Sequence, residues 1–335
     1  MCYKSSPPFL SLTSMSLILS SMMIMSSTNW IYLWMALELN LLSFMPLILS
    51  SNKFQETEAS VKYFMAQALG SSLLLISSML MWYHLPIMST FLNTMLIISL
   101  LIKIGMAPCH LWYSSVMTSV AWTQALLLST WQKMAPLFIL SFLIMNSKFL
   151  LMISAINALT GGLMGLNQSH FRTILAYSSI THMGWMSALI AMNKYLTAIM
   201  YFFLYFTIAF PIFLSLKSLF ASSMNNMNKF KMMSPQAILS IQILLLSLGG
   251  MPPLTGFIPK AMSILMLIPS TPILIIILIM GSLMNMYYYL NLMMFSFMSS
   301  LSYSMSNYKK ITLSIDVILM SLTAIISLPL MLWIL

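Results

Sequence analysis

The sequence predicts an all-α protein that crosses a membrane about eleven times. Of its 335 residues, 60% are hydrophobic and only 5% are charged, whereas a soluble domain carries about 25% charged residues. Apolar runs of about 20 residues recur along the chain, which is the length that a helix needs to span a bilayer. Strict alternation of apolar and polar residues is not seen, so a membrane β-barrel is not expected. Together these observations exclude an ordinary soluble globular protein.

Each apolar run is predicted as a helix, because lipid offers no hydrogen-bond partner to an open backbone. Aromatic residues near the ends of runs, such as Trp30, Trp82 and Tyr83, are typical of anchors at the membrane surface. The predicted spans lie near residues 9–27, 30–50, 57–82, 88–118, 120–145, 149–166, 170–192, 195–218, 236–267, 271–297 and 312–334.

Two of these spans are predicted to be discontinuous, because Gly and Pro release backbone groups in mid-helix. The fourth contains Gly105 and Pro108, and the ninth contains the run 249–253 (GGMPP). Broken helices at matching places in two halves indicate a transporter-type site near the bilayer midplane. We therefore expect one transmembrane domain over 1–335, built from inverted five-helix repeats at about 9–145 and 149–297, with a final helix near 312–334.

The basic residues outside the spans predict the orientation of the chain. Eight would lie on the same side as the N-terminus and two on the other, so the N-terminus is expected on the cytoplasmic side or its equivalent, a mitochondrial matrix. The first group comprises Lys4, Lys53, Arg172, Lys217, Lys229, Lys231, Lys309 and Lys310, and the second Lys148 and Lys194.

Four ionisable residues fall deep within predicted spans, namely Glu38, Lys103, Lys133 and Lys260. Glu38 is about eight residues into the second span, or roughly 12 Å along it. Burial favours the neutral form of such a group, and a neighbouring opposite charge favours the ionised form. These residues can therefore exchange protons near neutral pH. One acid cannot pair with several bases, so static ion pairs do not account for the whole set, although one pair could simply hold helices together.

Two further residues have open interpretations. Lys62 is only about five residues into its predicted span, so it either reaches the membrane surface or joins the buried set. His182 is either a satisfied core residue or, with hydroxyl groups beside it, a member of a proton relay. The hydroxyl groups belong to Tyr177, Ser178, Ser179 and Thr181.

The cysteines and the known binding motifs give no indication of a bound cofactor. Cys2 and Cys109 lack the spacing of a metal or disulfide site, and no phosphate, dinucleotide or metal-binding motif is present. Glu56 and Glu58 are expected at the start of a helix, where acids are favourable, and Asp316 is placed near the start of the last span. The net charge of +10 is spread over single basic residues, so no nucleic-acid partner is expected.

Several runs resemble subunit 2 of mitochondrial NADH:ubiquinone oxidoreductase, respiratory complex I, in the order of that family. The Met-rich and Ser-rich composition is similar to that of invertebrate mitochondrial products. The runs are 34–40 (WMALELN), 57–64 (TEASVKYF), 103–112 (KIGMAPCHLW), 130–136 (TWQKMAP), 178–185 (SSITHMGW) and 247–260 (SLGGMPPLTGFIPK).

The resemblance implies an antiporter-like subunit of the membrane arm that takes part in proton translocation. It implies that Glu38 pairs with Lys103, that Lys133 connects Lys103 to Lys260, and that this row belongs to a hydrated polar axis. It also implies no redox centre in this chain, because FMN and the iron–sulfur clusters lie in other subunits. The implied partners are a neighbouring antiporter-like subunit, small membrane subunits, accessory subunits and phospholipid.

The chain departs from the family pattern near both interruptions. The family commonly has Pro-Glu-Val one residue after the Trp that matches Trp112, and here the positions are Ser114, Ser115 and Val116. Cys109 replaces a usual aromatic residue, and Ala261 replaces a usual Trp. These departures affect local packing rather than the charged row.

Two other functions stay open at this point. A stand-alone cation/proton antiporter would move Na⁺ or K⁺ when reconstituted alone. A structural scaffold would only bridge neighbouring subunits, and its buried lysines would tolerate apolar replacement.

Overall fold

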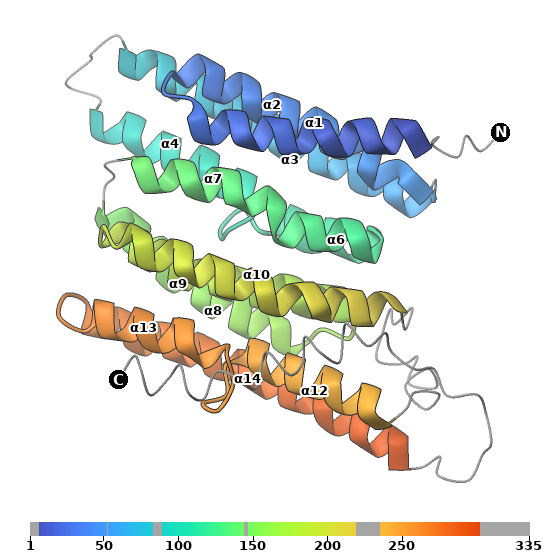
Figure 1. Cartoon of the computed structure of the whole chain (residues 1–335). Coiled ribbons are helices and arrows are strands. Elements are labelled where there is room, and N and C mark those ends of the chain that lie inside the picture. The colour runs from blue at the N-terminus through green and yellow to red at the C-terminus, as the bar shows by residue number, and fades with distance from the viewer. Residues whose placement is uncertain (1–6, 52, 83–88, 144–146, 219–234, 302–335) are drawn as a thin grey trace. The chain divides into compact units, whose positions relative to one another are not determined.

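The computed structural model describes residues 7–51, 53–82, 89–143, 147–218 and 235–301, and within these ranges the chain forms helices and no β-strand. The all-α prediction is therefore confirmed. The helices are α1 (Pro7–Ser26), α2 (Trp30–Ile48), α3 (Phe54–Trp82), α4 (Ser89–Ile104), α5 (Leu111–Ser119), α6 (Trp122–Ser129), α7 (Trp131–Phe142), α8 (Ser147–Leu166), α9 (Phe171–Ala191), α10 (Tyr195–Ser218), α12 (Pro235–Gly249), α13 (Phe257–Leu267) and α14 (Pro272–Leu301), with a short 3₁₀ turn at Leu49–Ser51 (Figure 1).

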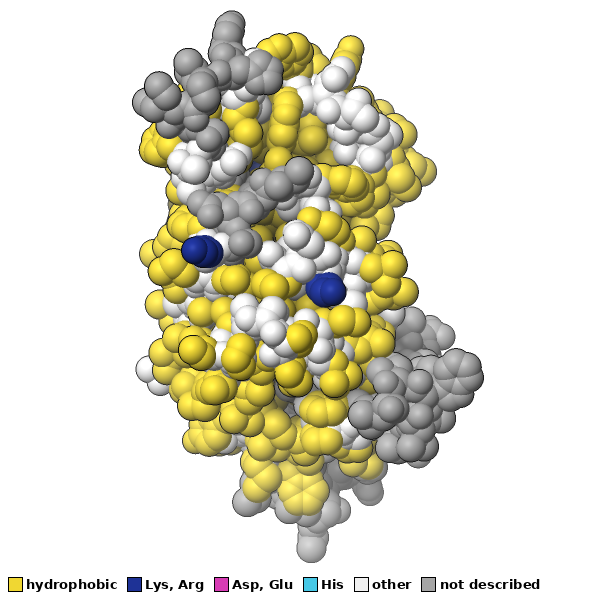
Figure 2. Space-filling model, turned by 90° about the vertical axis from the view of Figure 1, so that its left-hand side faces the viewer, with side chains coloured by type: hydrophobic (Ala, Val, Ile, Leu, Met, Phe, Trp, Pro, Cys, Tyr) yellow, Lys and Arg dark blue, Asp and Glu magenta, His cyan; other side chains and the backbone are white. Residues whose placement is uncertain are grey.

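Seven helical stretches of the described residues are long and apolar enough to cross a membrane, and three shorter apolar helices accompany them. Their boundaries lie within a few residues of those predicted. The predicted helix at 312–334, together with Lys309, Lys310 and Asp316, lies outside the described residues. The total of eleven spans therefore stays a prediction. Apolar side chains dominate the face shown in Figure 2, where dark blue charged side chains are few.

The chain divides into two compact units, residues 1–150 and 151–335. In the first unit, α1 packs against α2 and α7, α3 packs against α2, α4 and α5, and α4 packs against α7 (Figure 1). In the second unit, α9 packs against α10, α13 and α14, and α12 lies beside α10 and α14. The assignment of inverted repeats stays a prediction.

Both predicted helix interruptions are present, and a glycine ends the first half of each. Gly105 has φ +77° and Gly250 has φ +82°, a conformation that glycine adopts without steric cost. The amides of Gly105 and Met106 both donate to the carbonyl of Leu101, at 2.9 and 3.0 Å. The amide of Gly250 donates in the same way to Leu246, at 3.0 Å. Each first half-helix thus ends in a left-handed glycine turn that closes its last carbonyls.

A third interruption, which we did not predict, separates α6 from α7 at Thr130. The hydroxyl group of Thr130 donates to the carbonyl of Leu126 at 2.7 Å, and such a bond bends a helix by competing with the backbone ladder. Pro136 lies inside α7 and has no amide to offer to the preceding turn. The single span predicted at 120–145 is therefore two short helices in sequence.

Small residues let the helices of the second unit approach closely, as is common in membrane helix packing. A methyl group on Gly281 would collide with the backbone of Ala158, and one on Gly165 would lie 2.7 Å from the Tyr288 ring. The tightest such contact lies at the second interruption, where a methyl group on Gly256 would overlap the carbonyl of Ser247. Position 256, in the turn between α12 and α13, therefore has no room for a residue larger than glycine.

We expect Gly256→Ala to reduce the amount of assembled protein severely, because overpacking a filled site costs about 1–3 kcal/mol or more. Gly249→Ala is the matched control: its added methyl group would lie 3.4 Å from the nearest atom, an ordinary contact. The measurement is the yield of the membrane complex on a native gel. Equal yields of the two variants would contradict the packing at this turn.

Candidate functional site: buried lysines at helix interruptions

Three buried lysines each lie beside a helix interruption. Lys103 is 6% exposed and lies in the last turn of α4, two residues before the Gly105 turn. Lys133 is 2% exposed and lies in the first turn of α7, three residues after Thr130. Lys260 is 5% exposed and lies in the first turn of α13. Buried lysines need hydrogen-bond acceptors, and interruptions release backbone carbonyls.

Lys260 uses such a carbonyl directly. Its Nζ donates to the carbonyl oxygen of Gly249 at 2.5 Å, and Gly249 is the last residue of α12. The C-terminal end of a helix carries a partial negative charge and favours cations. The second interruption therefore creates the acceptor that holds the buried ammonium group of Lys260.

The interruption next to Lys103 is closed by side chains from two other helices. Gln67 of α3 donates through Nε2 to the carbonyl of Lys103, and the indole Nε1 of Trp112 donates to the carbonyl of Ile102, each at 3.0 Å. Gly70 permits the close approach of α3, because a methyl group there would lie 2.9 Å from Cγ of Lys103. The freed backbone of this turn is thus satisfied without the lysine ammonium group.

Glu38 lies half-buried on α2 and acts electrostatically on Lys103. No ion pair between the two side chains is formed in the described part of the chain, and the pairing implied by the family resemblance stays a prediction. Two residues further on, the buried side chain of Asn40 accepts a hydrogen bond from Gln132 at 3.1 Å, and Gln132 accepts one from the hydroxyl of Tyr63 at 3.3 Å. These two hydrogen bonds join α2, α7 and α3 at Gln132, the residue before Lys133.

The aromatic ring of Tyr113 covers Lys133. The Nζ of Lys133 lies 4.1 Å from the centroid of that ring, within the range of a cation–π contact. Both residues are buried, with Tyr113 at 0% exposure. An ammonium group at this position therefore meets a polarisable face supplied by α5.

His182 lies buried in α9 of the second unit, beside two tyrosines of α10. Its Nδ1 lies 3.0 Å from the hydroxyl of Tyr201, and its ring centroid lies 5.2 Å from that of Tyr205. The same side chains border a small cavity that reaches the second interruption. The cavity is lined in part by His182, Tyr201, Tyr205, Ser247, Gly256 and Pro259.

Lys62 lies in a different environment from the three buried lysines. Its side chain is 46% exposed and forms an ion pair with Glu58, one helical turn earlier, at 2.5 Å. Glu56 lies in the first turn of α3, as expected, and is buried. The structure thus places Lys62 on an outer face of α3 rather than among the buried groups. Among the described residues, no group of three or more His, Cys, Asp or Glu side chains is positioned to hold a metal ion.

Comparison with known proteins shows the family to which this chain is similar. Residues 27–285 match the family described as the membrane domain of NADH:quinone oxidoreductase and Mrp antiporter subunits. NADH-ubiquinone oxidoreductase chain 2 of Lumbricus terrestris is 48% identical over 86% of this chain and 87% of its own length. The protein of the same name from Anopheles gambiae is 37% identical over 88% of this chain and 85% of its own length.

The chain belongs to the NADH-ubiquinone oxidoreductase chain 2 family. The membership makes it a multi-pass subunit of the membrane arm of respiratory complex I, of mitochondrial origin, and so part of an NADH:ubiquinone oxidoreductase. A chain of respiratory complex I from Thermus thermophilus has the same fold, with a TM-score of 0.83 at 20% identity over 95% of this chain and 77% of that chain.

We did not identify from the sequence the side chains that contact the buried lysines, their turns or His182 in this member of the chain 2 family. Gln67 and Gln132 are amides within apolar runs, and an amide at bilayer depth is itself a signal that a partner exists. Tyr113 and Tyr201 give no such signal, because Tyr is common at span ends and in cores. Their contacts arise from helix packing, which one sequence does not reveal.

We expect Gln67→Leu to destabilise the assembled subunit, because it leaves the carbonyl of Lys103 buried without its donor, at a cost of about 1–3 kcal/mol. Gln55→Leu on the exposed start of the same helix is the matched control and should have little effect. Thermal inactivation of the membrane complex measures the difference. Identical midpoints for the two variants would show that Gln67 does not support the turn.

Proposed function

We propose that this chain carries protons across the mitochondrial inner membrane, coupled to electron transfer from NADH to ubiquinone, with Lys103, Lys133 and Lys260 as the proton carriers. The observation that supports the proposal most directly is that each of these buried lysines adjoins a helix interruption. Buried ionisable groups in membrane spans are costly and typically mark ion or proton pathways.

In this mechanism the three lysines alternate between charged and neutral forms. Helix carbonyls and an aromatic ring favour the charged form, and burial favours the neutral form, so a modest change in the surroundings moves a proton. Glu38 tunes Lys103 electrostatically. Switching requires an interaction that differs between the two charge states, and quinone chemistry elsewhere in the complex would supply it.

Two residues have secondary roles in the proposal. His182, with Tyr201 and Tyr205, would pass protons toward the second interruption, and the small cavity that these side chains border supports this role. Lys62, paired with Glu58 on the outer face of α3, would act on the path only through its field or through a partner subunit.

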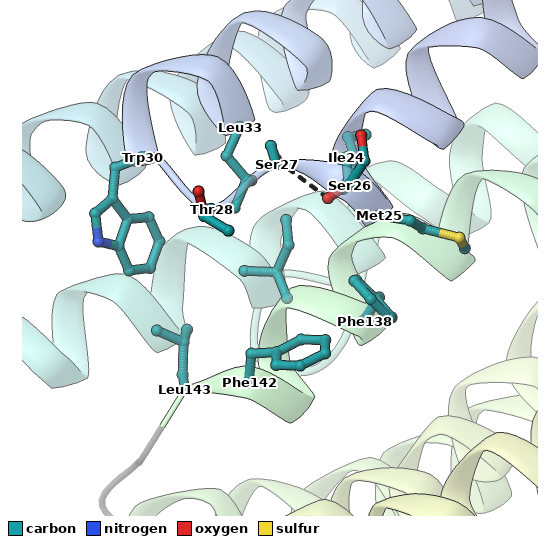
Figure 3. Close-up of a pocket in the computed structure, with 11 residues that line it drawn as sticks. Ile24, Met25, Ser26, Ser27, Thr28, Trp30, Leu33, Phe138, Phe142 and Leu143 are labelled. Atoms are coloured by element: carbon teal, nitrogen blue, oxygen red, sulfur yellow. Dashed lines mark hydrogen bonds between the residues drawn. The ribbon is translucent and has the colours of Figure 1, made fainter.

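The exposed apolar faces imply partners. We propose that neighbouring antiporter-like, small membrane and accessory subunits, together with phospholipid, cover them. An apolar pocket in the first unit, formed by the α1–α2 turn and the end of α7, is suited to a lipid acyl chain (Figure 3). Serine and threonine hydroxyls at residues 26–28 and the indole of Trp30 border the pocket and would meet the polar headgroup region.

A second candidate function is cation/proton antiport by this chain alone, because the matching family description also covers Mrp antiporter subunits. That function requires Na⁺ or K⁺ flux in vesicles that contain only this chain. The proton-carrier proposal predicts no such flux without the rest of the complex.

We expect Lys103→Met to abolish this subunit's share of proton pumping while assembly stays largely intact, because Met preserves the volume of the side chain and removes the ionisable group. The measurement is the ratio of protons pumped to electrons transferred in inner-membrane vesicles. Lys194→Met, at an exposed lysine, is the control. A normal ratio for Lys103→Met, with the same result for Lys133→Met and Lys260→Met, would favour the scaffold function.

The N-terminus is proposed to lie on the matrix side, and the two ends of α9 test this. In a background with Cys2 and Cys109 replaced by Ser, we expect Ser169→Cys to react with a membrane-impermeant maleimide from the matrix side. Lys194→Cys should react from the opposite side. The reverse pattern in right-side-out and inside-out vesicles would invert the proposed orientation.

A further inference from the structure

We propose that Tyr113 is a positioning residue for proton transfer, whose ring stabilises the protonated form of Lys133. The inference rests on the proposed role of Lys133 as a proton carrier. Tyr113 lies in the first turn of α5, the second half of the first broken helix, and Lys133 lies on α7. The contact therefore joins the first interruption to the next buried lysine along the chain.

The geometry of the contact favours an ammonium group. The Nζ of Lys133 lies 4.1 Å from the ring centroid of Tyr113, and both side chains are removed from solvent. The negative face of an aromatic ring attracts a cation, and the attraction grows as water is excluded. A ring also stabilises a cation without adding a negative charge to the membrane interior, which a carboxylate would do.

Tyr113 packs directly against the first interruption. A methyl group on Gly105 would lie 2.7 Å from Cβ of Tyr113, so the left-handed turn and this residue are in close contact. The neighbouring Trp112 donates its indole N–H to the carbonyl of Ile102 at 3.0 Å, which holds the start of α5 against the end of α4. A shift of the turn beside Lys103 would therefore move the ring that covers Lys133.

The helices that pack against α7 carry few titratable side chains in their sequences. Helix α7 packs against α1, α4 and α6, and α1 and α6 carry no titratable side chain in their sequences. Helix α4 carries one titratable residue, Lys103. Tyr63 of α3 approaches through its hydrogen bond to Gln132, and Glu38 lies on α2, two residues from Asn40, which Gln132 also contacts. Of these groups, Tyr113 is the one whose ring lies over the Lys133 ammonium group.

Ring-retaining and ring-removing substitutions test the inference in the assembled complex. We expect Tyr113→Phe to keep the wild-type pH dependence of the proton-to-electron ratio, because the ring face is retained. Tyr113→Leu and Tyr113→Met remove the ring, and Met adapts to the space that is left. For both, the alkaline limb of the pH profile should move to lower pH by about one unit, a tenfold loss of proton affinity.

Two controls separate this inference from the proposed function. Phe44→Leu removes another buried ring of the same unit, one that packs against Tyr63, and it should leave the pH profile in place. Lys133→Met tests the carrier itself. If Lys133→Met pumps normally, the proposed function fails. If Lys133→Met stops pumping but Tyr113→Leu and Tyr113→Met keep the wild-type profile, or shift it no more than Phe44→Leu does, the role of Tyr113 is refuted.

Discussion

The arrangement of this chain depends on how two costly groups in an apolar medium are satisfied together. A lysine ammonium group at bilayer depth needs acceptors, and an interrupted helix leaves carbonyls without donors. Lys260 and the carbonyl of Gly249 satisfy each other at 2.5 Å. Carbonyls in the interior of an unbroken helix already accept a backbone N–H, whereas the last carbonyl of α12 lacks that donor. At the second interruption the broken helix thus supplies the acceptor for the buried lysine.

The surrounding helices hold the interruptions in one conformation. Gln67 and Trp112 donate to the carbonyls beside Lys103, and the close approach of α3 depends on Gly70. A fully bonded turn has little reason to rearrange when a proton arrives or leaves, since its backbone needs no new partner. Under the proposed function, the proton occupancy of the lysine would change while the backbone of this turn keeps its hydrogen bonds.

Local properties of the sequence predicted much of the fold but little of what surrounds the lysines. Hydropathy locates the spans, and Gly105 and Gly250 locate two interruptions, because both effects act within a few residues. The break at Thr130 coincides with a side-chain bond to Leu126, and similar bonds occur inside unbroken helices of this chain, so the sequence alone does not predict it. The exposure of Lys62 depends on which face of α3 points outward. Hydropathy does not reveal that face, because the helix is apolar on most sides. Contacts such as that of Tyr113 with Lys133 come from helix packing.

The two glycine turns have the same backbone form but a different relation to their lysines. Both turns read Gly-Met-x-Pro, from Gly105 and from Gly250, and both end a half-helix in the same way. Lys103 precedes its turn by two residues, whereas Lys260 follows its turn by ten. Nevertheless, Lys103 lies in the last turn of α4, and Lys260 reaches back to the last carbonyl of α12. Only at the second of the two described turns does the lysine ammonium group donate to the end of the half-helix, whereas Gln67 and Trp112 take that place at the first. The two interruptions therefore share a backbone turn, and the groups that satisfy their carbonyls differ.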